Sequence, residues 1–169
     1  MSLRIAPSLV ALSNGEQMQI QADIACAISS SGNVLISGGD SSARADLARF
    51  LHGRDTTPNG ALVVLDESVL ARGLDVERMS RPGASRRTLF ITELTRLNRT
   101  AQQELMRLID STAATSAGEA PDTRIISATA QRLVGPLTSP EFDARLFYCL
   151  NTIHIALDAE SRPASYSIH

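Results

Sequence analysis

The stretch NVLISGGDSSARADLARFLH, Asn33 to His52, has the order of a buried strand, a glycine turn and an amphipathic helix. Val34–Ser37 is a short apolar run that predicts the strand. After the turn, Leu47, Phe50 and Leu51 fall on one helical face. This layout is typical of a phosphate-binding loop, whose pattern G-x-x-x-x-G-K brings backbone N–H groups and a lysine onto the phosphates.

Two positions of that pattern are altered. Gly38 holds the first glycine position, but Ala43 stands at the second, and Arg44 replaces the lysine. The Cβ of Ala43 costs about 1 kcal/mol if the turn needs a positive φ there, unless the loop changes shape. Arg44 keeps the charge on a longer, planar group, and the helix N-terminus would still attract an anion. A residual phosphate-binding turn and a purely structural turn therefore both remain open. The candidate phosphate-site residues are Gly38, Gly39, Ser41, Ser42 and Arg44.

The rest of the chain alternates between helical periodicity and apolar runs. Helical spacing predicts a helix over about Gln17–Ser29 and a short one within Val69–Leu74. A longer amphipathic helix runs from Leu97 to Ile109, with Asn98 as its N-cap. Because strands alternate with helices, we expect a mainly parallel sheet covered on both faces. The remaining strands are expected at Ala61–Asp66, Thr88–Thr92, Arg124–Thr129 and Thr152–Leu157.

Two stretches of turn-forming or small polar residues predict loops, at Arg81–Arg87 and at Ser111–Thr123. The final residues, 158–169, show no periodicity. A length of 169 residues suits one domain with its own core. We therefore expect a single domain over 1–169, with its core at about 15–157 and a tail at 158–169.

The composition is that of an ordinary globular protein, with 43% hydrophobic and 20% charged residues and a net charge of −2. This charge gives no general reason to expect nucleic-acid binding. No apolar run approaches the roughly 20 residues that span a bilayer, and the N-terminus lacks the long apolar core of a secretory signal. We expect Cys26 and Cys149 to be reduced core thiols of a cytoplasmic protein.

Four segments, taken in order, carry a family resemblance. They are GEQMQIQADIACAISSSGNVLISG, RRTLFITELTRLNRTAQQELMRLID, TRIISATAQRL and SPEFDARLFYCLNTIHIAL. Over Gly15 to Leu157 the chain resembles the α/β subdomain of the AAA+ ATPases that activate sigma-54-dependent bacterial transcription. The resemblance implies a three-layer P-loop NTPase-like fold, with a parallel five-stranded sheet between helices and with the helical lid of the family missing.

Several positions depart from the family's functional pattern. Ser41 stands at a middle glycine of the loop. Thr92 and Glu93 stand where the family has Asp-Glu, of which the aspartate organises Mg²⁺ and the glutamate orients the attacking water. The neutral Thr92 supplies no charge for a metal. Glu93 is either a vestigial catalytic residue or a solvated carboxylate near a strand end. Ala130 replaces the sensor asparagine.

The segment that matches the arginine finger is also altered. Asp143 and Cys149 occupy the two arginine positions, and Arg145 lies nearby but out of register. Arg145 is therefore either a shifted finger or a surface, salt-bridging residue. The span from Asp66 to Thr88 is too short for the family's GAFTGA insertion, and no such hexapeptide occurs. We therefore expect neither direct sigma-54 contact nor, without a helix-turn-helix module, DNA reading.

These departures predict a catalytically inactive, AAA+-like pseudo-ATPase rather than an enzyme. It would act as a regulatory or protein-interaction module in bacterial transcription control, with an AAA+ activator or a second copy as partner and with no cofactor, metal or membrane contact. The alternatives are a nucleotide-binding sensor that holds ATP or ADP weakly through Arg44, an active NTPase with unusual residues, and a nucleic-acid-binding protein. The last would use the basic residues Arg78, Arg81, Arg86 and Arg87.

Overall fold

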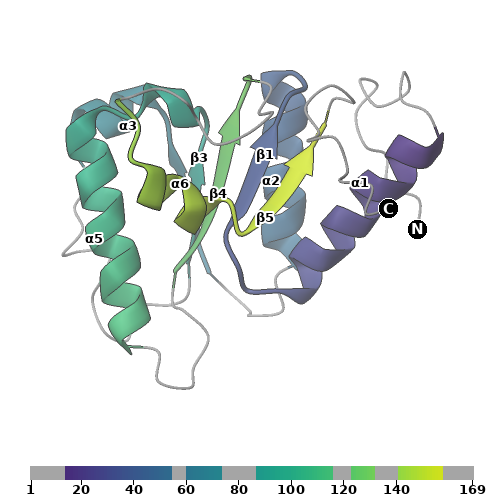
Figure 1. Ribbon diagram of the computed structural model, residues 1–169, viewed down its shortest axis with the longest axis horizontal. Helices are drawn as coiled ribbons and strands as arrows, with labels where there is room; N and C mark the ends of the chain where they lie inside the picture. The colour runs from purple at the N-terminus through teal and green to yellow at the C-terminus, as the bar shows by residue number, and fades with distance from the viewer. Residues whose placement is uncertain (1–13, 55–59, 74–86, 116–122, 132–140, 158–169) are drawn as a thin grey trace, which may run out of the picture.

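The computed structural model describes residues 14–54, 60–73, 87–115, 123–131 and 141–157. Strands and helices alternate along these parts of the chain (Figure 1). The helices are α1 (Asn14–Ser29), α2 (Ser41–Arg54), α3 (Glu67–Ala71), the 3-10 helix η2 (Leu94–Arg96), α5 (Arg99–Thr115) and α6 (Ala144–Leu150). The strands are β1 (Val34–Ser37), β2 (Leu62–Leu65), β3 (Arg87–Ile91), β4 (Thr123–Thr129) and β5 (Ile153–Ala156).

All five strands form one parallel sheet in the order β2-β3-β4-β1-β5. Strand β1 pairs on both sides, so that Val34 lies opposite Ile126 of β4 and opposite Ile153 of β5. The α/β fold with a five-stranded parallel sheet is thereby confirmed. Because parallel strands end at a common edge, the glycine turn after β1 and Glu93 after β3 lie at the same edge of the sheet.

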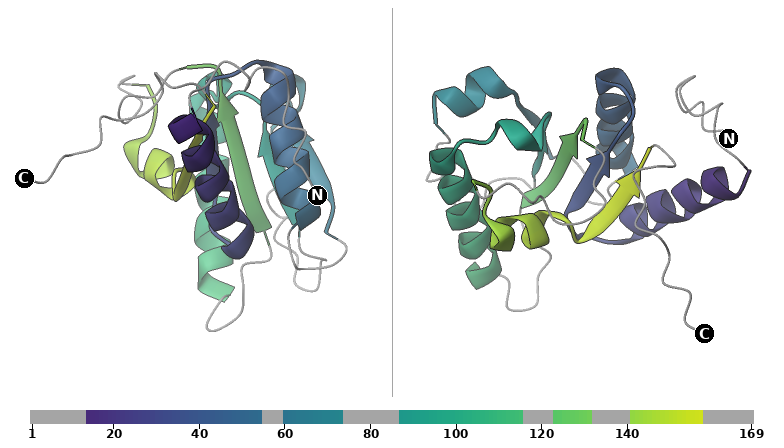
Figure 2. Two further views of the ribbon diagram at one scale, coloured as in Figure 1. Left: turned by 90° about the vertical axis from the view of Figure 1, so that its right-hand side faces the viewer. Right: turned by 45° about the horizontal axis from the view of Figure 1, so that its top comes forward.

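Helices cover both faces of the sheet and make two separate cores (Figure 2). Successive residues of a strand point to opposite faces, so Ile36 packs with α1 and α2 whereas Leu35 packs with α5 and α6. On the first face Leu47 of α2 is buried, and on the second face Leu105 of α5 is completely buried. The three expected layers are therefore present.

Helix α5 is longer than the sequence predicts. It continues to Thr115, so the prediction of a loop beginning at Ser111 is wrong up to that residue. The hydroxyl of Ser111 donates to the carbonyl oxygen of Leu108 at 2.8 Å. Such bonds to an earlier turn let small polar side chains remain in a helix. The rest of that predicted loop, up to residue 122, lies outside the described residues.

Two further elements differ from the predictions. Helix α6 was not predicted, because its sequence ARLFYCL is an almost continuous apolar run without a clear helical period. Arg87 begins β3, so the predicted loop Arg81–Arg87 is wrong at its last residue. Residues 74–86 and the predicted tail, 158–169, lie outside the described residues. Asn98 does cap α5, since its Oδ1 accepts from the amide of Ala101 at 2.8 Å.

Both cysteines are free thiols, but the prediction that they lie in the core is wrong. Cys26 is exposed on α1 and Cys149 is half-buried on α6. On α1 the buried face is formed by Ile20, Ile24 and Ala27 instead. Among the helices described, none combines the length and the hydropathy that a bilayer crossing requires.

Candidate functional site

The turn after β1 is short and left-handed. Gly38 and Gly39 have φ values of 72° and 62°, which glycine adopts without the strain that a side chain would bring. The amide of Gly38 donates to the carbonyl oxygen of Thr129, at the end of β4, over 3.1 Å. Helix α2 begins at Ser41, so only the two glycines and Asp40 separate the strand from the helix.

Asp40 closes the N-terminal end of α2. Its Oδ1 accepts a hydrogen bond from the amide of Ala43 at 2.7 Å, and its carbonyl oxygen accepts from the amide of Arg44 at 3.1 Å. An aspartate N-cap of this kind satisfies an amide that has no partner within the helix. The carboxylate also places a negative charge at the positive end of the helix dipole, where a bound phosphate would otherwise lie.

Arg44 folds back over the same turn. The residue is only 6% exposed, and its Nη1 donates to the carbonyl oxygens of Gly38 and Gly39 at 3.1 and 2.5 Å. In a phosphate-binding loop the lysine at this position reaches the β- and γ-phosphates. Here the cation is instead directed at the protein's own backbone. Its Nε is buried and has no acceptor among the described residues.

The presence of arginine rather than lysine at residue 44 says little about phosphate binding, whereas the contacts of its side chain say more. All 16 basic residues of the sequence are arginines, and none is a lysine. An arginine at position 44 therefore follows a preference of the whole chain. The fact that bears on phosphate binding is that its guanidinium group already bonds two carbonyls of the turn.

The structure brings the five predicted phosphate-site residues together, in the turn and the first turn of α2. Ser41 and Ala43, which stand at the two altered glycine positions, lie in the helix and not in the turn. Helical residues have negative φ, so neither position carries the strain that a tightly curled loop would impose. The cost that the sequence analysis attached to a positive φ at these two positions therefore does not arise.

Glu93, at the end of β3, is hydrogen-bonded at both carboxylate oxygens. Oε2 accepts from the amide of Ala130 at 2.8 Å, while Oε1 accepts from the amide and the hydroxyl of Thr95 at 3.3 and 2.9 Å. The hydroxyl of Thr129 is a further donor. A carboxylate has about four acceptor positions, and all are engaged. Glu93 is half-buried at the end of β3, where its carboxylate caps η2 and ties β3 to β4.

The pKa of Glu93 predicts a pH dependence of stability. Burial raises this pKa, but the hydrogen bonds from Thr129, Ala130 and Thr95 outweigh burial and hold it below its usual 4.5. A carboxyl group with a lowered folded pKa stabilises the fold above its unfolded pKa, and this contribution is lost as the pH falls through the folded value. We expect the Tm of the wild type to fall more steeply below pH 4.5 than the Tm of Glu93→Gln. Parallel melting curves down to about pH 3 would contradict this role.

Thr92 and Ala130 stand where the family has its metal-organising aspartate and its sensor asparagine, and both lie close to Glu93. Thr92 is half-buried, and its amide donates to the carbonyl oxygen of Leu65 at 3.3 Å. Ala130 is exposed, and it contributes its backbone amide to Glu93 rather than a side chain. Within the described segments, no three histidine, cysteine, aspartate or glutamate side chains are grouped to hold a metal ion.

The arginine-finger positions have local roles on α6. The Oδ1 of Asp143 accepts from the amide of Leu146 at 3.1 Å and caps the helix. The carbonyl oxygen of Cys149 accepts from Nδ2 of Asn33 at 3.0 Å and so connects α6 to the residue before β1. Arg145 forms a surface ion pair with Asp110 at 2.8 Å, which matches the second of the two interpretations that the sequence left open.

Two residues of this site were missed from the sequence. Asp40 could have been found, because an aspartate directly before a helical stretch is a common N-cap. Thr129 bonds both the glycine turn and Glu93, and these contacts join residues distant in the chain. Local periodicity gives no sign of such contacts.

Solved structures with the same architecture are those of NtrX from Brucella abortus. In complex with ATP, NtrX superposes with a TM-score of 0.64 at 21% identity over 88% of this chain and 36% of that chain. In complex with ADP, the TM-score is 0.62 at 20% identity over 88% of this chain and 38% of that chain. A RuvB variant from Thermotoga maritima gives 0.58 at 17% identity over 87% and 45%. At these identities the likeness shows the fold alone, and the chain spans less than half of each neighbour.

No curated protein sequence matches the chain. A family model, described as the sigma-54 interaction domain, matches residues 12–159. The match covers the glycine turn, Glu93, the end of β4 and helix α6. The chain therefore belongs to the sigma-54 interaction domain family, whose members are AAA+ ATPase domains.

Proposed function

We propose that this chain is a catalytically inactive member of the family, a pseudo-ATPase that acts as a regulatory or protein-interaction module in the control of bacterial transcription. The observation that carries the proposal is the turn after β1. Asp40 occupies the anion position at the N-terminus of α2, and Arg44 bonds the carbonyl oxygens of Gly38 and Gly39. A triphosphate would have to displace both side chains before it could reach the backbone amides of the helix.

Thr92 and Glu93, at the end of β3, support the same proposal. Hydrolysis of ATP needs Mg²⁺ to bridge the phosphates and a residue to orient the attacking water. Thr92 has no charge with which to hold the metal, and the acceptor positions of Glu93 are engaged by protein donors. Glu93 therefore acts as a structural carboxylate, and we propose no metal and no required cofactor for this chain.

The proposed activity is protein binding, since the family framework and both cores are intact. The partner would be an AAA+ activator or a second copy of the chain, in the cytoplasm, and neither sigma-54 nor DNA would be contacted directly. Phosphate release from ATP with Mg²⁺ tests the catalytic part. We expect a rate no higher than that of Glu93→Gln, with an active AAA+ activator domain as positive control. A wild-type rate that exceeds the rate of the variant about tenfold would overturn the proposal.

A second candidate is a sensor that binds ATP or ADP weakly without hydrolysis. It is favoured by the Nε of Arg44, which has no acceptor among the described residues, and by the amides of Ser41 and Ser42 at the start of α2. The NtrX structures with ATP and ADP make these two nucleotides the ones to test. Asparagine caps a helix as well as aspartate does, so Asp40→Asn keeps the cap and removes the competing charge.

The sensor predicts that ADP raises the Tm of the wild type, that Asp40→Asn enlarges this rise and that Arg44→Ala abolishes it. Should ADP leave the Tm of both the wild type and Asp40→Asn unchanged at millimolar concentration, the sensor is excluded. The protein-interaction module is then the remaining proposal.

A further inference from the structure

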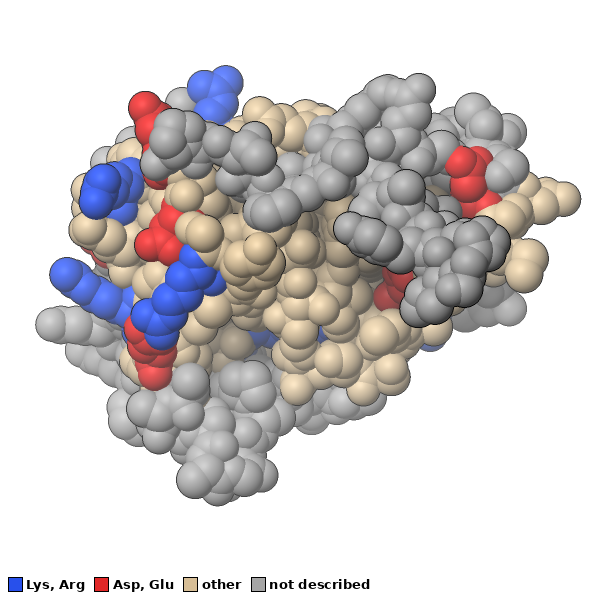
Figure 3. All heavy atoms as spheres, viewed as in Figure 1, with Lys and Arg blue, Asp and Glu red and all other residues tan. Residues whose placement is uncertain are grey.

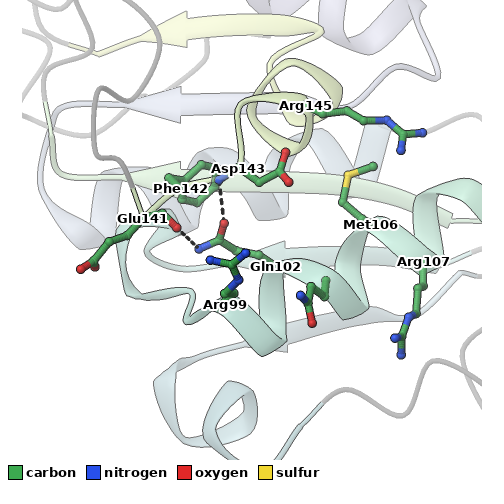
Figure 4. A pocket seen from close by; sticks show the side chains of 9 residues that line it. Arg99, Gln102, Met106, Arg107, Glu141, Phe142, Asp143 and Arg145 are labelled. Atoms are coloured by element: carbon green, nitrogen blue, oxygen red, sulfur yellow. Dashed lines mark hydrogen bonds between the residues drawn. The ribbon is translucent and has the colours of Figure 1, made fainter.

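A groove of about 550 Å³ lies on the opposite face of the sheet from α1 and α2, between α5 and the segment that leads into α6 (Figure 4). Its volume is in the range of protein binding sites. The described residues that line it belong to α5, to the segment Glu141–Asp143 and to the start of α6, and one of them is Asp143, an altered finger position. No residue of the glycine turn lines it.

The floor of the groove is held in place by one buried side chain. Gln102 of α5 is 4% exposed. Its Nε2 donates to the carbonyl oxygens of Leu97 and Glu141 at 2.9 and 3.2 Å. Its Oε1 accepts from the amide of Asp143 at 2.8 Å. Figure 4 shows these last two bonds joining α5 to the Glu141–Asp143 segment. These bonds hold the backbone of the Glu141–Asp143 segment against α5, which reduces the ordering that binding of a partner would require.

Apolar and aromatic groups lie in and beside the groove. Met106 and Phe142 line it and are half-buried against the core that α5 and α6 share. Tyr148 is 63% exposed, and it follows Arg145 at helical spacing, so both lie on the same side of α6. Methionine, tyrosine and arginine are enriched in protein interfaces.

Two cations of the groove form no ion pair within the part of the chain that the structure describes. Charged side chains gather over α5 on the face seen in Figure 3. Of the arginines lining the groove, Arg145 is paired with Asp110. Arg99 and Arg107 are exposed, and neither makes an ion pair with any residue that the structure describes. They are separated by about two helical turns, or roughly 12 Å along α5.

The position of Arg99 is unfavourable within the chain alone. Arg99 is the first residue of α5, where the helix dipole is positive and a cation is repelled. An external carboxylate near Arg99 would offset this repulsion. The groove also contains two carboxylates, those of Glu141 and Asp143. With Arg99, Arg107 and Arg145 it carries three positive charges against these two negative ones, so its net charge is +1.

We infer that the α5–α6 groove docks an acidic segment of a partner protein. That segment would present two carboxylates about two helical turns apart to Arg99 and Arg107, and an apolar side chain between them to Met106 and Phe142. The inference rests on the proposed function as an interaction module and supplies the chemistry of its partner. It does not depend on the state of the glycine turn, which lies outside the groove.

The test is binding of a fluorescent helical peptide, about 16 residues long, with two glutamates two turns apart and leucines between them. We expect fluorescence anisotropy to show binding to the whole protein that weakens as salt rises, because exposed charge pairs are screened. The double variant Arg99→Ala/Arg107→Ala should weaken binding about tenfold. The matched control Arg49→Ala/Arg54→Ala, on α2, removes the same charge elsewhere and should leave binding unchanged.

A peptide with glutamines in place of the two glutamates should bind the wild type as weakly as the glutamate peptide binds the double variant. A single-stranded DNA oligonucleotide should not displace the glutamate peptide. Equal binding to the wild type and the groove double variant, or no binding at all, would overturn the inference. Competition by the oligonucleotide that depends on Arg99 and Arg107 would identify a nucleic-acid surface instead and would also overturn it. Measured ATP hydrolysis would refute the inactive site and leave the groove result intact, so the two failures are distinguishable.

Discussion

Replacing Arg124 with leucine is expected to lower the free energy of unfolding by about 3 kcal/mol. Arg124 lies on β4 and is 1% exposed. Its Nε donates to the carbonyl oxygen of Gly32 at 3.1 Å and its Nη2 donates to that of Ala27. Ala27 is in the last turn of α1, whose carbonyls have no partner within the helix. Leucine cannot donate to these two oxygens, and an unsatisfied buried acceptor costs about 1–3 kcal/mol.

Urea denaturation and thermal melting measure this effect. For a domain of this size, 3 kcal/mol corresponds to a fall in Tm of roughly 10 °C. Arg124→Lys should lose less, since an ammonium group can still donate to one of the two carbonyls. Arg107→Leu is the matched control, because this arginine is exposed, and it should change stability by less than about 0.5 kcal/mol. If Arg124→Leu is as stable as this control, the guanidinium group does not hold α1 against the sheet.

Gly39→Ala is the substitution with the next largest expected effect, a loss of about 2 kcal/mol. Gly39 has a φ of +62°, and a Cβ there would lie 3.0 Å from Cδ1 and 3.2 Å from Cβ of Leu157. Both the left-handed backbone and this contact oppose a side chain. The substitution would also disturb the carbonyl oxygen that Arg44 bonds at 2.5 Å.

Gly53→Ala is the control, because it is expected to raise the free energy of unfolding rather than lower it. Gly53 lies in α2, and a Cβ there would meet no atom within 4 Å. Alanine is the better helix former, so this variant should gain about 0.5–1 kcal/mol. Chemical denaturation of both variants compares the two glycines directly. If Gly39→Ala is as stable as the wild type, the turn after β1 is not fixed in the left-handed form.

The parts of the fold that the sequence predicts are those with a strong local signal. The apolar run at Val34–Ser37 has no polar residue before its end, so it reads as a buried strand. The end of α5 is different. Ser111 favours a turn in isolation, but its hydroxyl bonds back to Leu108 and the helix continues. Helix α6 is fixed by Asp143 and by packing of Leu146 and Phe147 rather than by periodicity.

The site is less predictable than the fold, because long-range contacts decide its chemistry. The sequence places Arg44 at the lysine position but cannot tell whether its side chain points outward or back at Gly38. Glu93 obtains a donor from Ala130, which is 37 residues away. Arg124 reads as one residue of a strand, and its burial becomes visible only when α1 lies beside it. Residue identity alone therefore predicted which positions had changed and not what they bond to.

Isothermal titration of the whole protein with ATP and Mg²⁺ tests most directly whether its own side chains close the phosphate-binding turn. With Asp40 and Arg44 bonded as observed, we expect ATP to bind no more tightly than a Kd of about 1 mM, which corresponds to a binding free energy of about −4 kcal/mol. Binding with a Kd of a few micromolar, weakened by Arg44→Ala, would show instead that the arginine leaves the glycine carbonyls to hold phosphate and that the turn is open to nucleotide.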